Sequence, residues 1–318
     1  QATYSYMGED AQVTSDAATK YNSAAAYIFV TEAETSLLEA TLVTMDTDGF
    51  TINIGTASGA ANILNYLALG GGDLTNFIVK EFQNPTSASS VSYTGVGFKP
   101  DCIFILTPGV TGNSGATRNS VISSLGWGTS STARSTNSFR IGATVNPQIN
   151  EKVQLTNKII PQTNRGATFQ SADLTSLDTD GFTLNWTTAS TTARFNYALC
   201  LKGGKYKAGS FNQLTSAINQ SVAVGFKPSG VMLRSQNAVT SSSIIEDHRF
   251  SLGSASSSSS RSSIWTGDQD NVSPQQSNSN LDQTEIIRML THADTPTLDA
   301  EADFVSNNGS GFTINWQT

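Results

Sequence analysis

The feature that most constrains this chain is one phrase that occurs three times. It reads Asp-Thr-Asp-Gly-Phe-Thr-Ile-Asn-Ile at 46–54, Asp-Thr-Asp-Gly-Phe-Thr-Leu-Asn-Trp at 178–186 and Asn-Gly-Ser-Gly-Phe-Thr-Ile-Asn-Trp at 308–316. The shared glycines, at positions 49, 181 and 311, are 132 and 130 residues apart. Spacing of that size predicts repeated units of domain size instead of the short repeats of a solenoid.

A second phrase gives a similar spacing. Gly-Phe-Lys-Pro occurs at 97–100 and again at 225–228, each time before an apolar run. Proline is tolerated at the first position of a strand, so the phrase predicts a bend that starts a strand. Upstream of it, 77–82 and 206–211 are expected to be the opening strand of a unit.

The end of a unit is marked by a third pair of segments. Asn-Tyr-Leu-Ala-Leu at 65–69 and Asn-Tyr-Ala-Leu-Cys at 196–200 are each followed by glycines and are expected to be closing strands. The units are therefore placed at 1–72, 73–204 and 205–318. Asp-Gly between alternating apolar segments is a strong hairpin signal, and short strands with frequent turns favour an antiparallel sandwich. The expected fold is all-β, with tandem antiparallel β-sandwich units that are jelly-roll-like.

The two end units are expected to be incomplete. The first unit has no counterpart of the opening and Gly-Phe-Lys-Pro strands, and its segment 4–8 matches 123–126 and 250–253 loosely. The last unit has no counterpart of the closing strand. Unpaired sheet edges are a liability unless something covers them. Three hypotheses remain open: a neighbouring chain supplies the strands by β-augmentation, the end units are self-sufficient smaller sheets, or the strands are present with diverged sequences.

Composition excludes several classes of partner. Only 14% of the residues are charged, and the net charge of −7 with scattered Lys and Arg argues against nucleic-acid binding. No run approaches the roughly 20 apolar residues of a membrane span, and Gln1-Ala-Thr-Tyr does not resemble a signal peptide. Cys102 and Cys200 are expected to be buried thiols, with a disulfide left open.

The thrice-repeated phrase also resembles the start of a calcium loop. The carboxylates that could contribute are Asp46, Asp48, Asp178 and Asp180. The third copy has Asn308 and Ser310 instead and keeps the glycine, which favours a structural turn with Gly49, Gly181 and Gly311 at positive φ. Calcium remains a minor alternative, and no cofactor is expected.

No catalytic constellation is expected, so the chain is predicted not to be an enzyme. The two histidines, His248 and His292, are interpreted as surface or loop residues because the unit at 73–204 has none. The aromatic residues expected to pack the cores are Phe98, Phe104, Phe182, Trp186, Tyr197, Phe226, Phe312 and Trp316.

Together, Gly-Phe-Lys-Pro-Asp with its apolar strand and Asp-Thr-Asp-Gly-Phe-Thr-Leu some 80 residues later resemble a β-domain of tailed-bacteriophage virion proteins. The resemblance covers 97–105, 176–184 and 194–201, with 225–234 and 309–316 in the next unit. The closing strand lacks the family's usual Trp, and Arg165 is a doubtful counterpart of its Arg-Gly segment.

The resemblance implies a structural protein of the virion, in the capsid, tail or a fibre, which associates with itself and with other virion proteins. The alternative is a lectin-like module that binds host glycans through Trp127 and Trp265, with Arg261 near the same loop. The two hypotheses differ in whether these tryptophans are exposed or buried.

Overall fold

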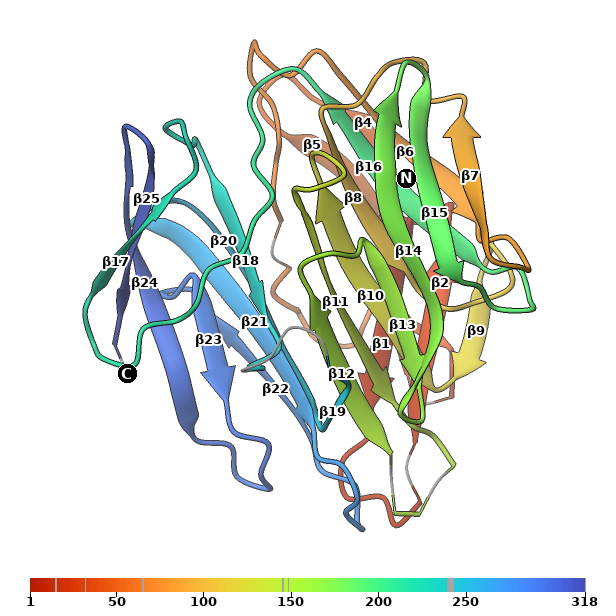
Figure 1. Ribbon diagram of the computed structural model, residues 1–318. Coiled ribbons are helices and arrows are strands. Elements are labelled where there is room, and N and C mark those ends of the chain that lie inside the picture. Colours follow the sequence, from red (N-terminus) through yellow and green to blue (C-terminus); the bar gives the residue numbers. More distant parts are fainter. Residues whose placement is uncertain are drawn as a thin grey trace.

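The computed structural model describes residues 1–14, 16–31, 33–64, 66–144, 146–147, 149–238 and 243–317. Within these residues it contains strands and no helix, and every paired strand runs antiparallel to its neighbours. The prediction of an all-β, sandwich-like fold is therefore confirmed. Figure 1 shows three groups of strands, with the blue strands of the C-terminal third on the left and the green strands at the front right.

The middle sandwich is built from two facing sheets. One has the strand order β12-β11-β10-β8-β16-β6 and the other the order β13-β14-β15-β7. The bounds are β6 Asn76–Gln83, β7 Ser89–Thr94, β8 Cys102–Thr107, β10 Val121–Gly128, β11 Arg134–Ile141, β12 Asn150–Leu155, β13 Ile160–Asn164, β14 Ala167–Asp178, β15 Gly181–Thr188 and β16 Phe195–Lys202.

The third sandwich has the same order with fewer strands. Its sheets are β18-β20-β21-β22 and β17-β25-β24-β23, so β18 takes the place of β8 and β25 that of β15. The bounds are β17 Asn219–Ala223, β18 Val231–Ser235, β20 His248–Ser257, β21 Ser260–Asp268, β22 Ser277–Asp282, β23 Ile287–Leu290, β24 Leu298–Asn308 and β25 Gly311–Trp316.

The first group contains β1 (Thr3–Gly8) and β2 (Ala17–Asn22), and a second sheet of β3 (Tyr27–Val30), β4 (Ser36–Met45) and β5 (Phe50–Thr56). The loose match of 4–8 with 123–126 is wrong. β1 pairs with β2 and precedes β3, as β11 pairs with β12 and precedes β13, so β1 corresponds to β11 and not to β10.

Consecutive groups also exchange short strands. β9 (Ala116–Asn119) lies between β8 and β10 in the chain, yet it pairs with β2 of the first group. β19 (Ile245–Glu246) lies between β18 and β20, and it pairs with β12 of the middle sandwich. Each of these strands extends a sheet of the preceding group, so the three groups form one continuous body.

The sheets of the three groups meet in a buried core of their own. Tyr6, Phe139 and Phe250 project from β1, β11 and β20 into this core, with ring centroids 4.9 Å apart for Tyr6 and Phe139 and 5.4 Å apart for Phe139 and Phe250. These residues lie on the outer faces of their sheets, because the inner faces fill the sandwiches. The groups are therefore packed by apolar burial as well as by strand exchange.

Strand alternation decides which of the expected core residues face inward. Phe182 and Trp186 in the middle sandwich, like Phe312 and Trp316 in the third, are buried in the sandwich interiors. Phe104 is not. Its neighbours Ile103 and Ile105 occupy the interior, so Phe104 points to the other face and meets Trp127 edge to face, with centroids 6.0 Å apart.

The remaining aromatics take intermediate positions. Phe98 is partly buried against the core of the middle sandwich, and Phe226 is half-buried in the bend before β18. Tyr197 is buried, but its ring lies outside the sandwich and stacks on Tyr21 of the first group at 5.5 Å.

Cys102 and Cys200 are both buried and free, as the sequence favoured. Cys200 pairs across the strands with Ile103, and Cys102 with Leu201, so the two thiols stand on opposite faces of one sheet. Burial raises the pKa of each thiol to about 12. Neither group is poised to react as a thiolate.

Two expected strands are not formed. Residues 206–211 are not a strand, since the corresponding β6 pairs only with β16 and no described strand takes the place of β16 in the third sandwich. Residues 66–69 are not a strand either, because the first group has no counterpart of β8 to pair with them. Asn65 lies outside the described residues.

Candidate functional site: an open sheet edge in the third sandwich

The most distinctive surface of the molecule is the free edge of β18. In the described part of the chain β18 pairs only with β20, so its other side has no strand partner. A groove of about 460 Å³ opens beside this edge. Polar and apolar residues line it, and the apolar ones are Trp127, Phe211, Met232, Leu233, Ala238, Ile287, Met289 and Trp316.

The middle sandwich shows what fills the corresponding place. There β16 pairs with β8, and β6 pairs with β16 beyond it. Ala198 and Cys200 of β16 point inward and help to close the core, together with Ile78 and Phe82 of β6. The groove of the third sandwich is therefore the position of a strand that would complete its sheet.

Two sets of contacts shape the walls of this groove. Phe211 lies against the third core with its ring 6.1 Å from that of Phe312, as Phe82 lies 5.5 Å from Phe182. On the opposite wall, Arg234 stacks on Trp127 with its guanidinium 3.6 Å from the ring centroid. Arg234 also donates hydrogen bonds to the carbonyl of Leu125 and to the Ser135 hydroxyl. Burial lowers the pKa of Arg234.

The repeated turn has a hydrogen-bonding role in all three groups. Asp46 accepts hydrogen bonds from the hydroxyls of Thr44 and Thr51, both at 2.7 Å. Asp178 accepts from Ser176 and Thr183, both at 2.6 Å. The two hydroxyls at Asp46 lower its pKa. These carboxylates hold the hairpin closed by bridging its two strands.

The third copy keeps part of this pattern without a charge. The Asn308 amide accepts from the backbone N–H of Ser310 at 3.1 Å, and its Nδ2 donates to the hydroxyl of Thr313 at 3.4 Å. Asparagine can therefore substitute for aspartate at the turn, because a hydrogen bond and not a charge is what the hairpin requires.

The second aspartate of the phrase has a different partner. Asp180 accepts from the backbone N–H groups of Gly95 and Gly97 at 2.9 and 2.5 Å, and these bonds lower its pKa. The hairpin tip is thereby joined to the bend before β8. Asp48 is exposed. Among the residues that the structure covers, no three His, Cys, Asp or Glu side chains are grouped as a metal site would need.

The expectation of a positive φ at all three glycines is wrong. Only Gly181 has one, at 145°. A Cβ at Gly181 would lie 2.0 Å from the carbonyl oxygen of Tyr93 in β7, and one at Gly311 would lie 1.9 Å from that of Val222 in β17. At Gly49 nothing lies within 4 Å, since no strand of the described ranges pairs on that side of β5. The close approach of a neighbouring strand is therefore what requires glycine.

The two tryptophans considered for glycan binding do not share a surface. Trp265 is only 1% exposed and faces the interior of the third sandwich. Trp127 is half-buried beneath Arg234 and lines the groove. These rings therefore do not form the exposed platform that the lectin-like alternative requires.

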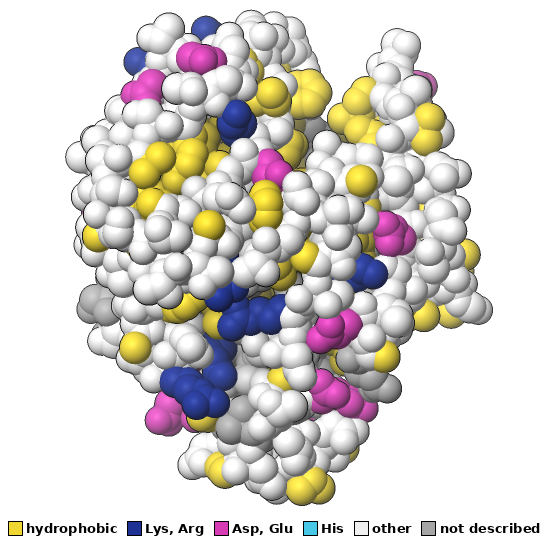
Figure 2. Space-filling view, turned by 90° about the vertical axis from the view of Figure 1, so that its right-hand side faces the viewer, with side chains coloured by type: hydrophobic (Ala, Val, Ile, Leu, Met, Phe, Trp, Pro, Cys, Tyr) yellow, Lys and Arg dark blue, Asp and Glu magenta, His cyan; other side chains and the backbone are white. Residues whose placement is uncertain are grey.

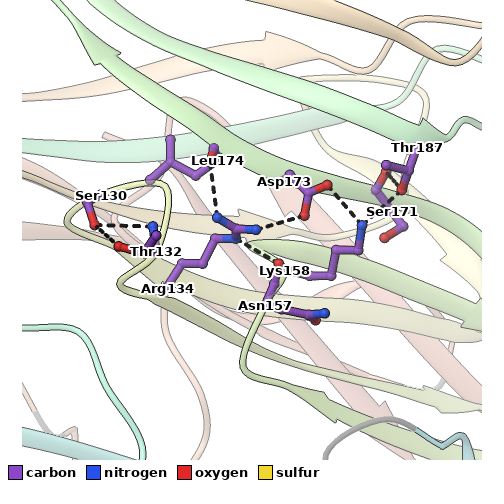
Figure 3. A network of polar contacts seen from close by, with 9 residues as sticks. All are labelled: Ser130, Thr132, Arg134, Asn157, Lys158, Ser171, Asp173, Leu174 and Thr187. Carbon is purple, nitrogen blue, oxygen red and sulfur yellow. Dashed lines mark hydrogen bonds and ion pairs between the residues drawn. The ribbon is translucent and has the colours of Figure 1, made fainter.

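Arg261 belongs to a clamp between sheets. It forms an ion pair with Asp303 at 2.5 Å and donates to the carbonyl of Thr284. Figure 3 shows the same arrangement in the middle sandwich, where Arg134 binds Asp173 at 3.1 Å and the carbonyls of Asn157 and Leu174. Lys158 completes it with a 3.0 Å ion pair to Asp173.

Arg165 has no comparable clamp. It adopts a φ of 54°, and the next residue, Gly166, donates its N–H to Glu151 at 2.6 Å. The segment is a tight turn between β13 and β14.

The interpretation of His248 as a surface or loop residue is wrong. Its ring is fully buried in the core between the groups, 4.2 Å from Phe139, and burial lowers its pKa to about 3. His248 Nε2 contacts the Thr266 hydroxyl at 3.0 Å and lies 3.9 Å from buried Asp268. Burial raises the pKa of Asp268 to about 7. His248 and Asp268 lie at the interface between the groups, and neither residue lines the β18 groove.

The other histidine is partly exposed. His292 Nε2 lies 3.1 Å from Asp247. Desolvation lowers the pKa of His292, opposed by the charge of Asp247.

The sequence predicts that the third sandwich lacks a closing strand, but it does not predict the groove that lies in the place of that strand. Its walls come from Phe211, β18, β23 and the outer face of β10–β12, which are far apart in the sequence. The exchanged strands β9 and β19 were also missed, because four and two residues carry no detectable alternation. Across the described residues, no helical segment has the length and apolar character of a membrane span.

Comparison of the chain with protein-family models, with curated proteins and with solved structures gave no match. The function is therefore argued from the sequence and the geometry of the chain itself.

Proposed function

We propose that this chain is a non-enzymatic structural protein of a virus particle that assembles through sheet edges and loops. The observation that carries the proposal is the open edge of β18, with an apolar groove beside it. A free sheet edge beside a groove with apolar side chains in its walls is a template for pairing with another chain. The resemblance of the Gly-Phe-Lys-Pro-Asp and Asp-Thr-Asp-Gly-Phe-Thr-Leu phrases to tailed-phage virion domains supports the same assignment.

The contacts between the three groups are consistent with a structural role. Strand exchange and the shared core around Phe139 join the three groups, and the Arg–Asp clamps join the two sheets of the complete sandwich and of the third. Figure 2 shows that hydrophobic side chains also reach one outer face in several patches. Extended apolar patches on a surface mark sites of association.

The test is the location of the chain in purified phage particles that encode it. Mass spectrometry of washed particles and gold-labelled antibodies should detect the chain at a fixed copy number and place. Absence of the chain from intact particles would overturn the assignment. A glycan array probed with the purified chain tests the lectin-like alternative, and specific hits would favour it.

A further inference from the structure

A segment of this chain matches the strand that the β18 groove lacks. Among the described residues from 57 to 75 no strand is formed, although the segment is apolar. Tyr66 is 73% exposed, and Leu67 and Leu69 are each 48% exposed. Side chains of this kind are normally buried, so their exposure on one short segment marks a contact surface.

The sequence of this segment corresponds to β16. Tyr-Leu-Ala-Leu at 66–69 is followed by three glycines, as Tyr-Ala-Leu-Cys at 197–200 is followed by Leu-Lys-Gly-Gly. In the middle sandwich, Tyr197 pairs with Leu106 and Cys200 with Ile103. Residues 66–69 therefore have the sequence of β16 but no counterpart of β8 to pair with, and β18 is a counterpart of β8 that pairs with no counterpart of β16 among the described residues.

The register of the match can be worked out. The Gly-Phe-Lys-Pro phrases align β8 with β18 at a spacing of 128, and the pairing of β18 with β20 repeats that of β8 with β10. Transferring the pairing of β16 with β8 sets Tyr66 opposite Arg234, Leu67 opposite Leu233, and Ala68 opposite Met232. Leu69 then stands opposite Val231.

This register places the right side chains in the groove. Ala198 and Cys200 of β16 point into the core, so Leu67 and Leu69 would point into the groove toward Ile287, Met289 and Trp316. Tyr66 would point outward toward Arg234 and Trp127, as Tyr197 points outward toward Tyr21.

The occupant is a second copy of the chain. Within one folded chain the segment at 66–69 and the groove beside β18 are both open, so the two do not meet there. Residues 57–72 contain no charged side chain, so inserting this segment into the groove removes no charge of the donor copy from water. We propose that residues 66–69 of one copy add to the β18 edge of the next.

A contact of this kind is heterologous, since the donor and acceptor surfaces differ. Such contacts build either an open chain, which keeps a free acceptor at one end and a free donor at the other, or a closed ring, which keeps neither. This inference rests on the proposed role in assembly, and it names the partner and the strand that the assembly uses.

The test is cross-linking between two variants that each carry one added cysteine. The Ala68→Cys and Met232→Cys variants are mixed. Residues directly opposite each other on paired strands have Cβ atoms about 4.5–5.5 Å apart, close enough for a disulfide. Neither variant alone carries both cysteines of this pair. The expected result is a disulfide-linked dimer of the two variants. The matched control replaces Met232→Cys with Ser235→Cys, three residues out of register on the same strand. The native thiols are buried and do not compete.

A second measurement follows association by sedimentation over a range of concentrations. Leu67→Asp would bury a carboxylate in the groove, and we expect it to weaken self-association at least about 100-fold. Ile63→Asp, a matched change at another exposed apolar residue of the same segment outside the pairing, should leave association unchanged. A double variant A68C/M232C that links within one chain at high dilution would overturn the inference.

The remaining outcomes separate the two proposals. Self-association that is insensitive to Leu67→Asp, with no linkage between positions 68 and 232, refutes the strand pairing and leaves the structural role intact. A chain that stays monomeric at all concentrations also refutes the pairing between copies. Absence of the chain from particles refutes the structural role independently.

Discussion

The same substitution, Gly to Ala, should destabilise the protein at two of the three repeated glycines and be tolerated at the third. Replacing Gly181 or Gly311 by Ala adds a Cβ that would lie 2.0 or 1.9 Å from a carbonyl oxygen of the neighbouring strand. Real Cβ contacts are not closer than 3.0 Å, so the strand must move away by about 1 Å or more. At Gly49 the same Cβ meets nothing within 4 Å. Alanine there should be tolerated.

The expected magnitudes follow from the geometry. Overpacking against a backbone that cannot yield costs ~1–3 kcal/mol, and at Gly181 the φ of 145° adds ~1–2 kcal/mol of strain. Gly181→Ala should therefore destabilise by ~2–5 kcal/mol and Gly311→Ala, which lacks the strain of a positive φ, by ~1–3 kcal/mol. Gly49→Ala should stay within about 0.5 kcal/mol, as for an ordinary surface position.

Urea denaturation of the three variants measures these differences, and hydrogen exchange locates them. Protection should fall in β7 for Gly181→Ala and in β17 for Gly311→Ala, because these strands must separate from β15 and β25. Equal destabilisation by all three substitutions would refute the reasoning, since it would mean that the turn itself requires glycine.

Three further predictions concern charged groups. Asp268 is buried with its pKa raised to about 7, so its contribution to stability is present below about pH 4 and is lost as the pH rises through 7. Ionisation of Asp268 should lower the free energy of unfolding by on the order of 4 kcal/mol between pH 4 and 8, and Asp268→Asn should remove this decrease. Urea unfolding at both pH values measures it, and a variant with the same pH profile as the native chain would refute this. Arg134→Met should destabilise the middle sandwich by ~2–3 kcal/mol. In a double-mutant cycle, Arg134→Met combined with Asp173→Asn should cost less than the sum of the two single changes, and fully additive costs would exclude the clamp. Millimolar calcium or a chelator should leave the thermal midpoint unchanged, because the Asp178 carboxylate already accepts two hydroxyl hydrogen bonds; a calcium-dependent rise would revive the metal hypothesis.

Much of the fold could be predicted because its signals are local. The hairpin at 178–181 follows from Asp-Gly between alternating residues, and the burial of Phe182 and Trp186 follows from period-two alternation. The inward residue in an all-apolar strand could not be predicted, because Ile103 and Phe104 are equally suited to either face. The closing strand expected at 65–69 is wrong for another reason: its sequence is that of a strand, but no described strand pairs with residues 66–69.

The pairing of β9 with β2 determines when the first group can mature during synthesis. Its edge partner is made about 100 residues after β2 itself, and β19 follows β12 by a similar interval. Until each strand arrives, the earlier sheet exposes hydrogen-bonding groups that another nascent chain could pair with. The order of translation therefore sets the order in which these sheet edges are paired. The first and the middle group each gain this edge strand only when part of the next group has left the ribosome. A truncation at residue 72 or 204 would remove that seal while leaving every residue of the preceding group in place.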